Sequence, residues 1–321
     1  MRTDSKDFGH IGVLAGGPSN ERGISLKSGC AVYDALIREG LDALFLDVRD
    51  DICAIIEANK IDVAFIALHG RFGEDGTVQK ILEEAGIPYT GSGVEASRLA
   101  LDKVASKEIF VKRRIPVPRS VVFEKNRYNL DDGMKLGFPV VVKPQYEGSS
   151  IGLSVVRDPG SLIEALAKAF RYGQKAILEE YIDGRELTVS IVGEKPLPVI
   201  EIVPKNKIYD YAAKYSDPDT KYLVPAPVEK ASYKKAQALG LAAHRALGCR
   251  ALSRVDMMMN GRGDIFVLEV NTIPGMTERS LLPKAASVDG LSFSKLCVEL
   301  IEYALKTGNP SLPHETHGSS G

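Results

Sequence analysis

Two short polar segments around residues 254 and 270 contain the residue types with the clearest potential for chemistry. Arg254 and Asp256 alternate with apolar residues in one segment, and Glu269 and Asn271 do so in the other. Side chains of a strand alternate between its two faces, so each pair shares a face. The residues between the segments, 260–263, read Asn-Gly-Arg-Gly and predict a hairpin turn. If both pairs face the same side, two carboxylates and an amide oxygen converge beside an arginine, and such oxygen ligands suit magnesium.

A solvent-facing polar strand is the alternative interpretation, and the alternation alone does not decide between the two. The residues that follow favour a site. Thr272 to Thr277 contain the pair Pro274-Gly275, which bends the chain sharply. A bend at Gly275 allows its backbone N–H to meet a ligand.

The segment 143–152 combines a lysine with small residues. A predicted strand ends at Lys143, and a loop rich in glycine and serine leads to a second strand. A lysine beside free backbone amides can hold a phosphate group. The loop has neither the GxxxxGK[ST] order of a P-loop nor the GxGxxG pattern of a dinucleotide site. Taken alone, it fits a plain hairpin connection as well.

Two further polar positions follow predicted strands in the first hundred residues. His69 opens a glycine-rich segment at the carboxyl end of a predicted parallel strand, where ligands bind in open α/β sheets. Taken alone, His69 fits a loop histidine with a local hydrogen bond. Glu21 stands at the start of the first predicted helix, where it fits either a substrate contact or compensation of the helix dipole.

Apolar periodicity predicts the elements that position these residues. In the first part, strands over 10–15, 44–48 and 63–68 and a helix over 25–38 indicate parallel strands joined by helices. A helical stretch over 94–114, broken near Asp102, ends this alternation of strands and helices. Strands then dominate, with one helix among them, a long polar loop, two further helices and a disordered tail. The predicted ranges are strands 120–123, 140–143, 151–156, 176–181 and 187–192, helix 160–172, loop 208–225, helix 228–247, hairpin strands 251–258 and 265–270, helix 293–305 and tail 306–321.

Composition excludes several classes of protein. The 41 basic and 42 acidic side chains of the 321 residues give a net charge of −1, so the chain lacks the basic excess of a nonspecific nucleic-acid binder. Its apolar runs fall short of the ~20 residues that span a bilayer, and its start lacks a signal peptide. The length predicts two or three domains. The cysteines have no metal-ligand spacing and predict buried free thiols in a reducing cytosol; they are Cys30, Cys53, Cys249 and Cys297.

Taken together, these segments resemble one family. From Ile11 to about Leu305 the chain is similar to the D-alanine–D-alanine ligases of the ATP-grasp superfamily. The segments that carry the resemblance are GGPSNERGISLKSG (16–29), HGRFGEDGTVQ (69–79), YTGSG (89–93), DKVASK (102–107), VVVKPQYEGSSIG (140–152), YDYAAKY (209–215), SRVD (253–256) and EVNTIPGMT (269–277). Each is weak alone, but together in this order they are specific.

The resemblance implies an α/β and α+β protein with the ATP-grasp fold, in which two antiparallel sheets enclose ATP. It implies a parallel α/β domain over 1–96, a central lid domain over 97–183, a C-terminal domain over 184–307 and a disordered tail over 308–321. The implied nucleotide ligands are Lys103 and Lys143 for the α- and β-phosphates, Lys214 for the γ-phosphate, Glu179 for the adenine amino group with the backbone of Tyr181 and Ile182 nearby, and Glu186 for the ribose. Two Mg²⁺ or Mn²⁺ ions would be held by Asp256, Glu269 and Asn271.

The same resemblance implies roles around the D-alanines. Glu21 would pair with the ammonium of the first D-alanine and would form a triad with Ser149 and Tyr215 that closes the 208–225 loop. Arg254 and the Gly275 N–H would form an oxyanion hole. His69 would line the first pocket, and Ser280 and Leu281 would receive the carboxylate of the second D-alanine. Arg279 and Lys284 depart from the family pattern beside that pocket, where they could bind the carboxylate or face solvent.

The implied activity is the ATP-dependent joining of two D-alanines through a D-alanyl phosphate, for peptidoglycan precursors, by a cytoplasmic bacterial homodimer. The alternatives are an ATP-grasp ligase for another pair of amino or hydroxy acids, and a non-catalytic nucleotide-binding regulator. The presence of the lysines, the metal ligands and Arg254 argues against the regulator.

Overall fold

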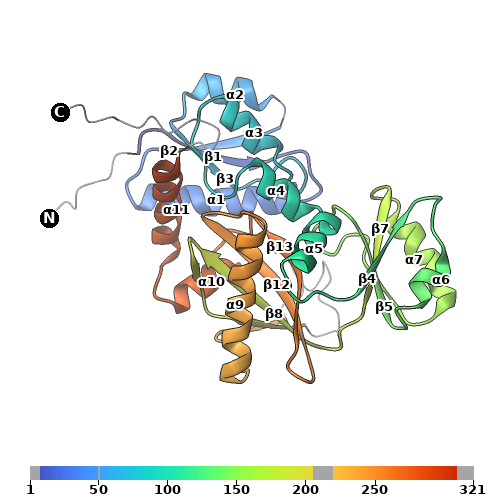
Figure 1. Cartoon of the computed structure of the whole chain (residues 1–321). Coiled ribbons are helices and arrows are strands. Elements are labelled where there is room, and N and C mark those ends of the chain that lie inside the picture. The colour runs from blue at the N-terminus through green and yellow to red at the C-terminus, as the bar shows by residue number, and fades with distance from the viewer. Residues whose placement is uncertain (1–7, 50, 205–219, 309–321) are drawn as a thin grey trace, which may run out of the picture.

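The computed structural model describes residues 8–49, 51–204 and 220–308 of the chain. Within these ranges the strands form one parallel sheet and two antiparallel sheets (Figure 1). The parallel sheet lies at the top of Figure 1 in blue, one antiparallel sheet forms the green lobe at the right, and the other lies below in yellow and orange. The expected combination of α/β and α+β parts is confirmed. None of the described helices is long and apolar enough to cross a bilayer.

The parallel sheet places Glu21 and His69 in the loops at the carboxyl ends of its strands. Its strands are β2 (Ala43–Val48), β1 (Ile11–Gly16) and β3 (Val63–Ile66), in that order. Every residue of β1 is buried, as expected for a parallel strand covered on both faces. On one face lie α1 (Arg22–Arg38) and α11 (Phe293–Thr307), and on the other α2 (Ile52–Asn59) and α3 (Thr77–Glu84). The loops after β1 and β3 carry Glu21 and His69, and Ser19 Oγ joins them by donating to the His69 carbonyl at 2.6 Å.

The first antiparallel sheet directs Lys143 and Glu179 to the same face. It has the order β4 (Ser120–Glu124), β7 (Lys175–Glu180), β5 (Val140–Pro144) and β6 (Ser154–Val156). Val140 and Val142 share an apolar core with α7 (Leu162–Ala169), beside α6 (Leu130–Met134) and the 3₁₀ turn η1 (Pro159–Ser161). The alternate residues point the other way. Opposed residues of antiparallel strands share a face, so the pairings Val141–Glu179 and Lys143–Ile177 put both charged side chains there.

The second antiparallel sheet directs Asp256 away from its helix. The order along it is β11 (Lys221–Leu223), β10 (Ile200–Val203), β8 (Gly184–Val192), β12 (Leu252–Asn260) and β13 (Ile265–Asn271), with β9 (Lys195–Pro196) paired to β8. Helix α9 (Lys230–Ala246) covers the face that carries Val189 and Val255. Thr188 and Asp256 alternate with these residues, so they lie on the opposite face, directly paired with each other.

Two helices connect the parallel sheet to the green lobe. Asp102 ends α4 (Val94–Leu101) and begins α5 (Lys103–Lys112), which confirms the predicted break. Its carboxylate accepts hydrogen bonds from the N–H groups of Val104 and Ala105, at 3.0 and 3.1 Å, in the manner of a helix N-cap. The buried residues of α5 are Lys103, Ser106, Lys107 and Phe110, whose spacing is that of one helix face. Two lysines therefore point inward from this helix.

Most predicted elements are confirmed to within a few residues, two ranges are wrong, and the predicted tail starts two residues too early. The strand predicted over 151–156 begins only at Ser154, because Ser149, Ser150 and Gly152 have positive φ angles of 51, 59 and 74° that turn the chain. The loop predicted over 208–225 includes a strand, since Lys221–Leu223 pairs with β10; its residues up to 219 lie outside the described ranges. Helix α11 extends to Thr307, beyond the predicted end at 305 and into the predicted tail, of which residues 309–321 are not described.

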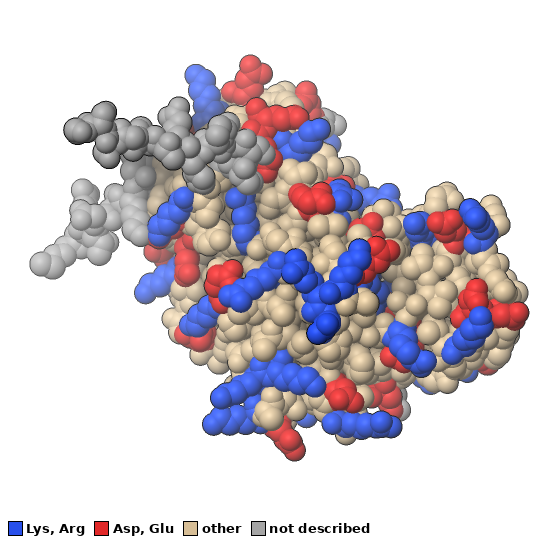
Figure 2. Space-filling model, viewed as in Figure 1, with Lys and Arg blue, Asp and Glu red and all other residues tan. Residues whose placement is uncertain are grey.

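Other features were not predicted. Helices α2, α3 and α6 and α10 (Leu281–Val288) span at most 8 residues each, too few turns for a clear apolar period. The expectation of buried thiols holds for Cys249 and Cys297 but is wrong for Cys30 and Cys53, which are free and exposed. On the face shown in Figure 2, basic and acidic side chains are interspersed, in keeping with the near-zero net charge.

A buried histidine predicts how stability depends on pH. His244 of α9 is 1% exposed, with Nδ1 2.7 Å from Ser253 Oγ, and burial lowers the pKa of His244 to about 4. An unfolded chain binds this proton near pH 6.5. The free energy of unfolding is therefore unaffected by His244 above pH ~6.5 and falls as the pH drops from there to about 4. Between pH 7.5 and 5, the wild type should lose ~2 kcal/mol more than His244→Leu in urea unfolding. Equal losses would contradict this.

Candidate active site

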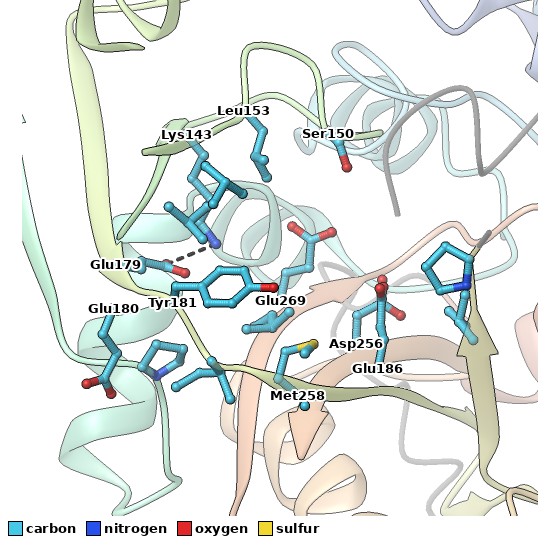
Figure 3. Close-up of a pocket in the computed structure, with 18 of the residues that line it drawn as sticks. Lys143, Ser150, Leu153, Glu179, Glu180, Tyr181, Glu186, Asp256, Met258 and Glu269 are labelled. Atoms are coloured by element: carbon cyan, nitrogen blue, oxygen red, sulfur yellow. Dashed lines mark ion pairs between the residues drawn. The ribbon is translucent and has the colours of Figure 1, made fainter. Parts of the chain in front are cut away.

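A cavity of about 380 Å³ lies between the two antiparallel sheets. Figure 3 shows Lys143 and Glu179 on one side and Glu269, Asp256 and Glu186 pointing in from the other. Eight of the predicted site residues line it. They are Lys103, Lys143, Glu179, Tyr181, Ile182, Glu186, Asp256 and Glu269.

The hairpin of β12 and β13 brings together the four residues singled out from the sequence. Asp256 stands directly opposite Glu269, and Arg254 directly opposite Asn271, so all four share one face. Immediately beyond Asp256 the register shifts, because Met257 pairs with Val267 and leaves an extra residue in β13. A bulge of this kind twists the strand and re-aims the adjacent side chain. The predicted convergence is confirmed.

Asp256 is held from three sides. The Arg254 guanidinium donates to both of its oxygens, at 2.9 and 2.8 Å. Thr188 Oγ1 donates to Oδ1 at 2.7 Å, and Asn271 Nδ2 donates to Oδ2 at 3.1 Å. Asp256 is 6% exposed, and a carboxylate this buried needs such partners. The arrangement fixes the orientation of its oxygens toward the cleft.

The donor set fits a magnesium ion. Asp256 and Glu269 supply carboxylate oxygens, and the Asn271 amide donates through its nitrogen, which leaves its oxygen for a metal. This set has two carboxylates and an amide; in the described part of the chain no group of three or more His, Cys, Asp or Glu side chains is placed to hold a metal ion. Magnesium prefers a few oxygen ligands from the protein and completes its shell with phosphate and water.

Helix α5 pairs its two inward lysines with carboxylates of different sheets. Lys103 Nζ lies 3.2 Å from Glu269 Oε2 and donates to the Glu147 carbonyl at 2.8 Å. Lys107 Nζ lies 2.9 Å from Glu179 Oε1. Lys143 Nζ approaches the same Glu179 oxygen at 2.9 Å, the contact drawn as a dashed line in Figure 3.

Burial and charge act in opposite directions on Glu179. Its side chain is 3% exposed, and burial alone would raise its pKa. Lys143 and Lys107 outweigh that effect, so the pKa of Glu179 lies below its ordinary value. The carboxylate is therefore ionised at neutral pH and can accept hydrogen bonds from a ligand.

The segment that joins the two sheets forms the inner end of the cleft. β7 ends at Glu180 and β8 begins at Gly184, so Tyr181 and Ile182 lie in the crossover. The Tyr181 N–H already donates to the Pro139 carbonyl at 3.2 Å. Glu186 faces the cleft beside Asp256 (Figure 3). Apolar side chains complete the walls, among them Val141, Ile151, Leu153, Val155, Ile202, Met258 and Leu268.

A second polar group lies where the loops of the parallel sheet meet the 143–152 loop. Ser149 Oγ donates to Glu21 Oε1, which confirms that these two predicted residues come together. Gly148 and Gly70 both approach the Glu21 carboxylate so closely that a Cβ at either would lie within 3.3 Å of it. Arg71 Nη2 lies 3.2 Å from Glu147 Oε1 and adds a second bridge between the loops.

His69 belongs to a buried chain of hydrogen-bonding groups. Its Nδ1 lies 3.4 Å from Glu74 Oε1, and its Nε2 lies 3.1 Å from Ser28 Oγ. Ser28 Oγ also accepts from the Met276 N–H at 3.3 Å. Burial raises the pKa of Glu74. These hydrogen bonds connect His69 to the 272–277 turn, a long-range link that neither sequence-based interpretation of His69 included.

Gly275, Ser280 and Leu281 lie together at the start of α10. A Cβ on Gly275 would lie 3.0 Å from Ser280 Oγ, so the two residues are adjacent. Ser280 Oγ accepts from the Thr277 N–H at 3.1 Å. Leu281 is 9% exposed and packs in the core, which leaves its backbone as the part able to meet a ligand. An N–H group at a helix start favours an anion such as a carboxylate.

The two departures from the family pattern differ in environment. Arg279 is exposed. Lys284 is half-buried, with Nζ 4.5 Å from the centre of the Tyr222 ring, and burial together with Arg279 lowers its pKa. Lys284 thus contacts an aromatic ring and does not simply face solvent.

Some residues fall outside the predicted set or the described ranges. Lys214 and Tyr215 lie in 205–219, which the structure does not describe. Lys107, Thr188, Glu74 and Ser28 were missed. Lys107 stands one helical turn after Lys103, a spacing that signals a shared face. Thr188 has a short polar side chain in an apolar strand, a weak signal, and Glu74 and Ser28 show their partners only in three dimensions.

Most of the chain is similar to known D-alanine–D-alanine ligases. The family model described as the D-ala D-ala ligase C-terminus matches residues 109–302, and the corresponding N-terminus model matches 50–92. The D-alanine–D-alanine ligase of Trichlorobacter lovleyi is 48% identical over 96% of this chain and 99% of its own, and that of Stutzerimonas stutzeri is 44% identical over 95% and 98%.

Solved structures agree with these relatives. The crystal structure of the Bacillus anthracis D-alanine–D-alanine ligase superposes with a TM-score of 0.85 at 39% identity, covering 93% of this chain and 98% of that one. The crystal structure of a Bacillus anthracis D-alanine–D-alanine ligase complexed with ATP gives a TM-score of 0.83 at 36% identity, covering 93% of this chain and 98% of that one.

The contact between Thr188 and Asp256 yields a prediction. Thr188→Val keeps the shape of a fully buried side chain but removes its hydrogen bond to a buried carboxylate. Such bonds to charged groups contribute ~1.5–3 kcal/mol, so the free energy of unfolding should fall by about that amount. The Mg²⁺ concentration that gives half-maximal activity should rise severalfold, because Asp256 loses one of the contacts that orient it.

Ser190→Ala provides the matched control on the same strand. Ser190 is equally buried, and its hydroxyl has no hydrogen-bond partner in the described part of the chain. Urea unfolding and a magnesium titration should leave this control close to the wild type. Equal behaviour of both variants would contradict the role given to Thr188.

Proposed function

This chain belongs to the D-alanine–D-alanine ligase family, and we propose that its cleft joins two D-alanines at the expense of ATP. One observation carries the proposal. Three ion pairs from helix α5 and the two antiparallel sheets meet at one cavity: Lys103 with Glu269, Lys143 with Glu179, and Arg254 with the cavity-lining Asp256. Such a set of cations and acidic ligands matches what phosphoryl transfer requires, namely positioning and neutralisation of phosphate charge.

The nucleotide would lie in this cavity. The ionised Glu179 at its inner end suits the amino group of adenine, and the apolar walls suit the ring. Since the Tyr181 N–H is already engaged, its carbonyl and the backbone of Ile182 remain for the base.

Glu186 would bind the ribose. Lys103 and Lys143 would hold the α- and β-phosphates, and Lys214 would approach the γ-phosphate.

Asp256, Glu269 and Asn271 would hold two Mg²⁺ or Mn²⁺ ions. Bound there, the metal supplies positive charge that neutralises the phosphates and lowers the barrier to their transfer. Thr188 and Arg254 orient Asp256, and Lys103 lies against Glu269. These residues keep the acidic ligands in place before the nucleotide arrives.

The first D-alanine would bind beside Glu21. This carboxylate sits under Gly70 and Gly148, where it can pair with an ammonium group, and His69 lines the same region. A free carboxylate is a poor electrophile. Transfer of the γ-phosphoryl group to it yields ADP and a D-alanyl phosphate, whose phosphate is a good leaving group.

The second D-alanine would bind at the start of α10. Its carboxylate would meet Ser280 and the backbone of Leu281, and its neutral amine attacks the acyl carbon. Arg254 and the Gly275 N–H would stabilise the oxyanion that develops, an effect typically worth ~2.7–4 kcal/mol per donor. Expulsion of phosphate and loss of a proton from the nitrogen complete D-alanyl-D-alanine, a peptidoglycan precursor.

Water must be excluded because it hydrolyses an acyl phosphate. The contacts of Ser149 with Glu21 and of Arg71 with Glu147 hold the 143–152 loop against the parallel-sheet unit. Tyr215 would add to the first of these when the 208–225 segment covers the substrates. A closing segment has this chemical purpose in many enzymes.

Several broader proposals accompany the activity. We propose domains over 1–96, 97–183 and 184–307, work in the bacterial cytoplasm, and a homodimer; these rest on the family resemblance and on composition. The alternative of a ligase for another amino or hydroxy acid pair shares the same nucleotide site, and product analysis separates it from the main proposal. The presence of every charged cleft residue named above argues against a non-catalytic regulator.

The activity is tested by phosphate release with ATP, Mg²⁺ and a panel of D- and L-amino acids. Turnover with D-alanine is the expected result. Mass spectrometry of products from an equimolar mixture of D-alanine and D-lactate should show mainly the dipeptide. An absence of turnover with D-alanine would contradict the proposal. A dominant ester product would instead support the alternative ligase.

The metal assignment is tested by Glu269→Gln. This change removes one negative charge, keeps the side-chain volume and leaves an amide that can still contact Lys103. Activity at saturating Mg²⁺ should fall below a tenth of the wild type, while the thermal unfolding midpoint stays within a few degrees. Glu299→Gln, on α11 away from the cleft, serves as a control with unchanged activity. More than a tenth of wild-type activity in Glu269→Gln would count against the assignment.

A further inference from the structure

We propose that Lys107 is a positioning residue for the nucleotide. It is the permanent counter-ion of Glu179 and keeps that carboxylate ionised when Lys143 turns to the phosphates. Lys107 thereby sets the preference for a purine with a 6-amino group. The inference rests on the proposed nucleotide site and assigns a task to a residue that does not itself line the cleft.

The geometry separates the two lysines that share Glu179. Both Nζ atoms lie 2.9 Å from Glu179 Oε1, and both side chains are almost fully buried. Lys143 and Glu179 are among the described residues that line the cavity, whereas Lys107 is not. Lys107 reaches the carboxylate from α5, on the side away from the cleft. A ligand in the cavity can therefore compete for Lys143 but not for Lys107.

Charge balance explains why two lysines are needed. Without nucleotide, one carboxylate faces two ammonium groups. When phosphate oxygens enter, Lys143 is attracted to them and its pairing with Glu179 weakens. If Lys107 were absent, a carboxylate only 3% exposed would lose its compensating charge, which is strongly unfavourable for a buried ion. Such a group either takes up a proton or retains Lys143, and each outcome weakens nucleotide binding.

The charge state of Glu179 decides which base is accepted. An ionised carboxylate only accepts hydrogen bonds, so it matches the 6-amino group of adenine and repels the 6-oxo group of hypoxanthine. A protonated carboxyl carries a donor and can bind the 6-oxo group. The charged groups that act on this pair are Lys143, Lys107 and Glu180, and burial lowers the pKa of Lys107 itself. Its ion pair with Glu179 opposes that shift, so the two groups stabilise each other's charged forms.

The test compares Lys107→Met with the wild type. The variant should raise the KM for ATP at least tenfold with a much smaller fall in kcat, leave the KM for D-alanine unchanged, and reduce the preference for ATP over inosine triphosphate at least fivefold. Lys107→Arg should restore part of the lost affinity. Lys112→Met, at the exposed end of the same helix, is the matched control and should match the wild type. An unchanged KM for ATP, or equal changes for both substrates, overturns the proposal.

A double-mutant cycle identifies the partner. In a Glu179→Gln background there is no carboxylate to compensate, so adding Lys107→Met should have little further effect on nucleotide affinity. A full additional loss overturns the pairing. If Lys107→Met alone is too unstable to assay, rescue of its folded state by Glu179→Gln supports the proposal and failure of that rescue overturns it.

Nucleotide affinity is also measured as ADP binding by calorimetry without D-alanine. This readout separates the two proposals. A wild type that binds ADP but forms no dipeptide overturns the proposed ligation and leaves the Lys107 assignment intact. Normal dipeptide formation with an unchanged ADP affinity in Lys107→Met overturns the assignment and leaves the ligation intact.

Discussion

The cleft depends on charges that are buried in pairs before any ligand enters. Helix α5 supplies one lysine to Glu269 of the second antiparallel sheet and another to Glu179 of the first. Unpaired, each such ion would cost several kcal/mol, so the pairs oblige both sheets to keep their carboxylates beside this helix. In the proposed function, the same charges would bind the phosphates and the metal ions. The proposed catalysis would therefore use the same ion pairs that stabilise the two sheets against helix α5.

Hydrogen bonds from neighbouring strands give this arrangement its precision. Thr188 and Arg254 fix Asp256, and Asn271 uses its nitrogen toward Asp256 and keeps its oxygen toward the cleft. The bulge beside Asp256 then alters the direction of β13 where Glu269 enters the cavity. Polar groups that strands already hold in place need little reorganisation when a ligand binds, which is the basis of electrostatic preorganisation.

The sequence predicted those parts of the site whose geometry follows from a local period. Strand side chains repeat on the same face every two residues, which puts Arg254 and Asp256 on one face. The turn at 260–263 then pairs them with Glu269 and Asn271 of the next strand. Lys107 and Thr188 were not predicted, because the carboxylates that they contact lie on strands far away in the sequence. The turn at Ser149 and Ser150 escaped prediction for another reason: serine rarely adopts positive φ, and tertiary contacts such as that with Glu21 hold it there. The short helices lacked enough turns to show a period.

The packing of α11 carries a consequence for how the protein is made. This last helix shares a core with Ile11, Val13 and α1, near the other end of the chain. During synthesis the parallel sheet leaves the ribosome before α11, so α1 covers its part of this face while the part that packs against α11 stays uncovered until residues near 300 emerge. Domains generally fold as units during synthesis, the N-terminal one first, and hydrophobic surface that is exposed in the meantime is prone to aggregate. The parallel sheet must therefore wait for α11, and the apolar surface that α11 will cover needs protection from aggregation during that interval.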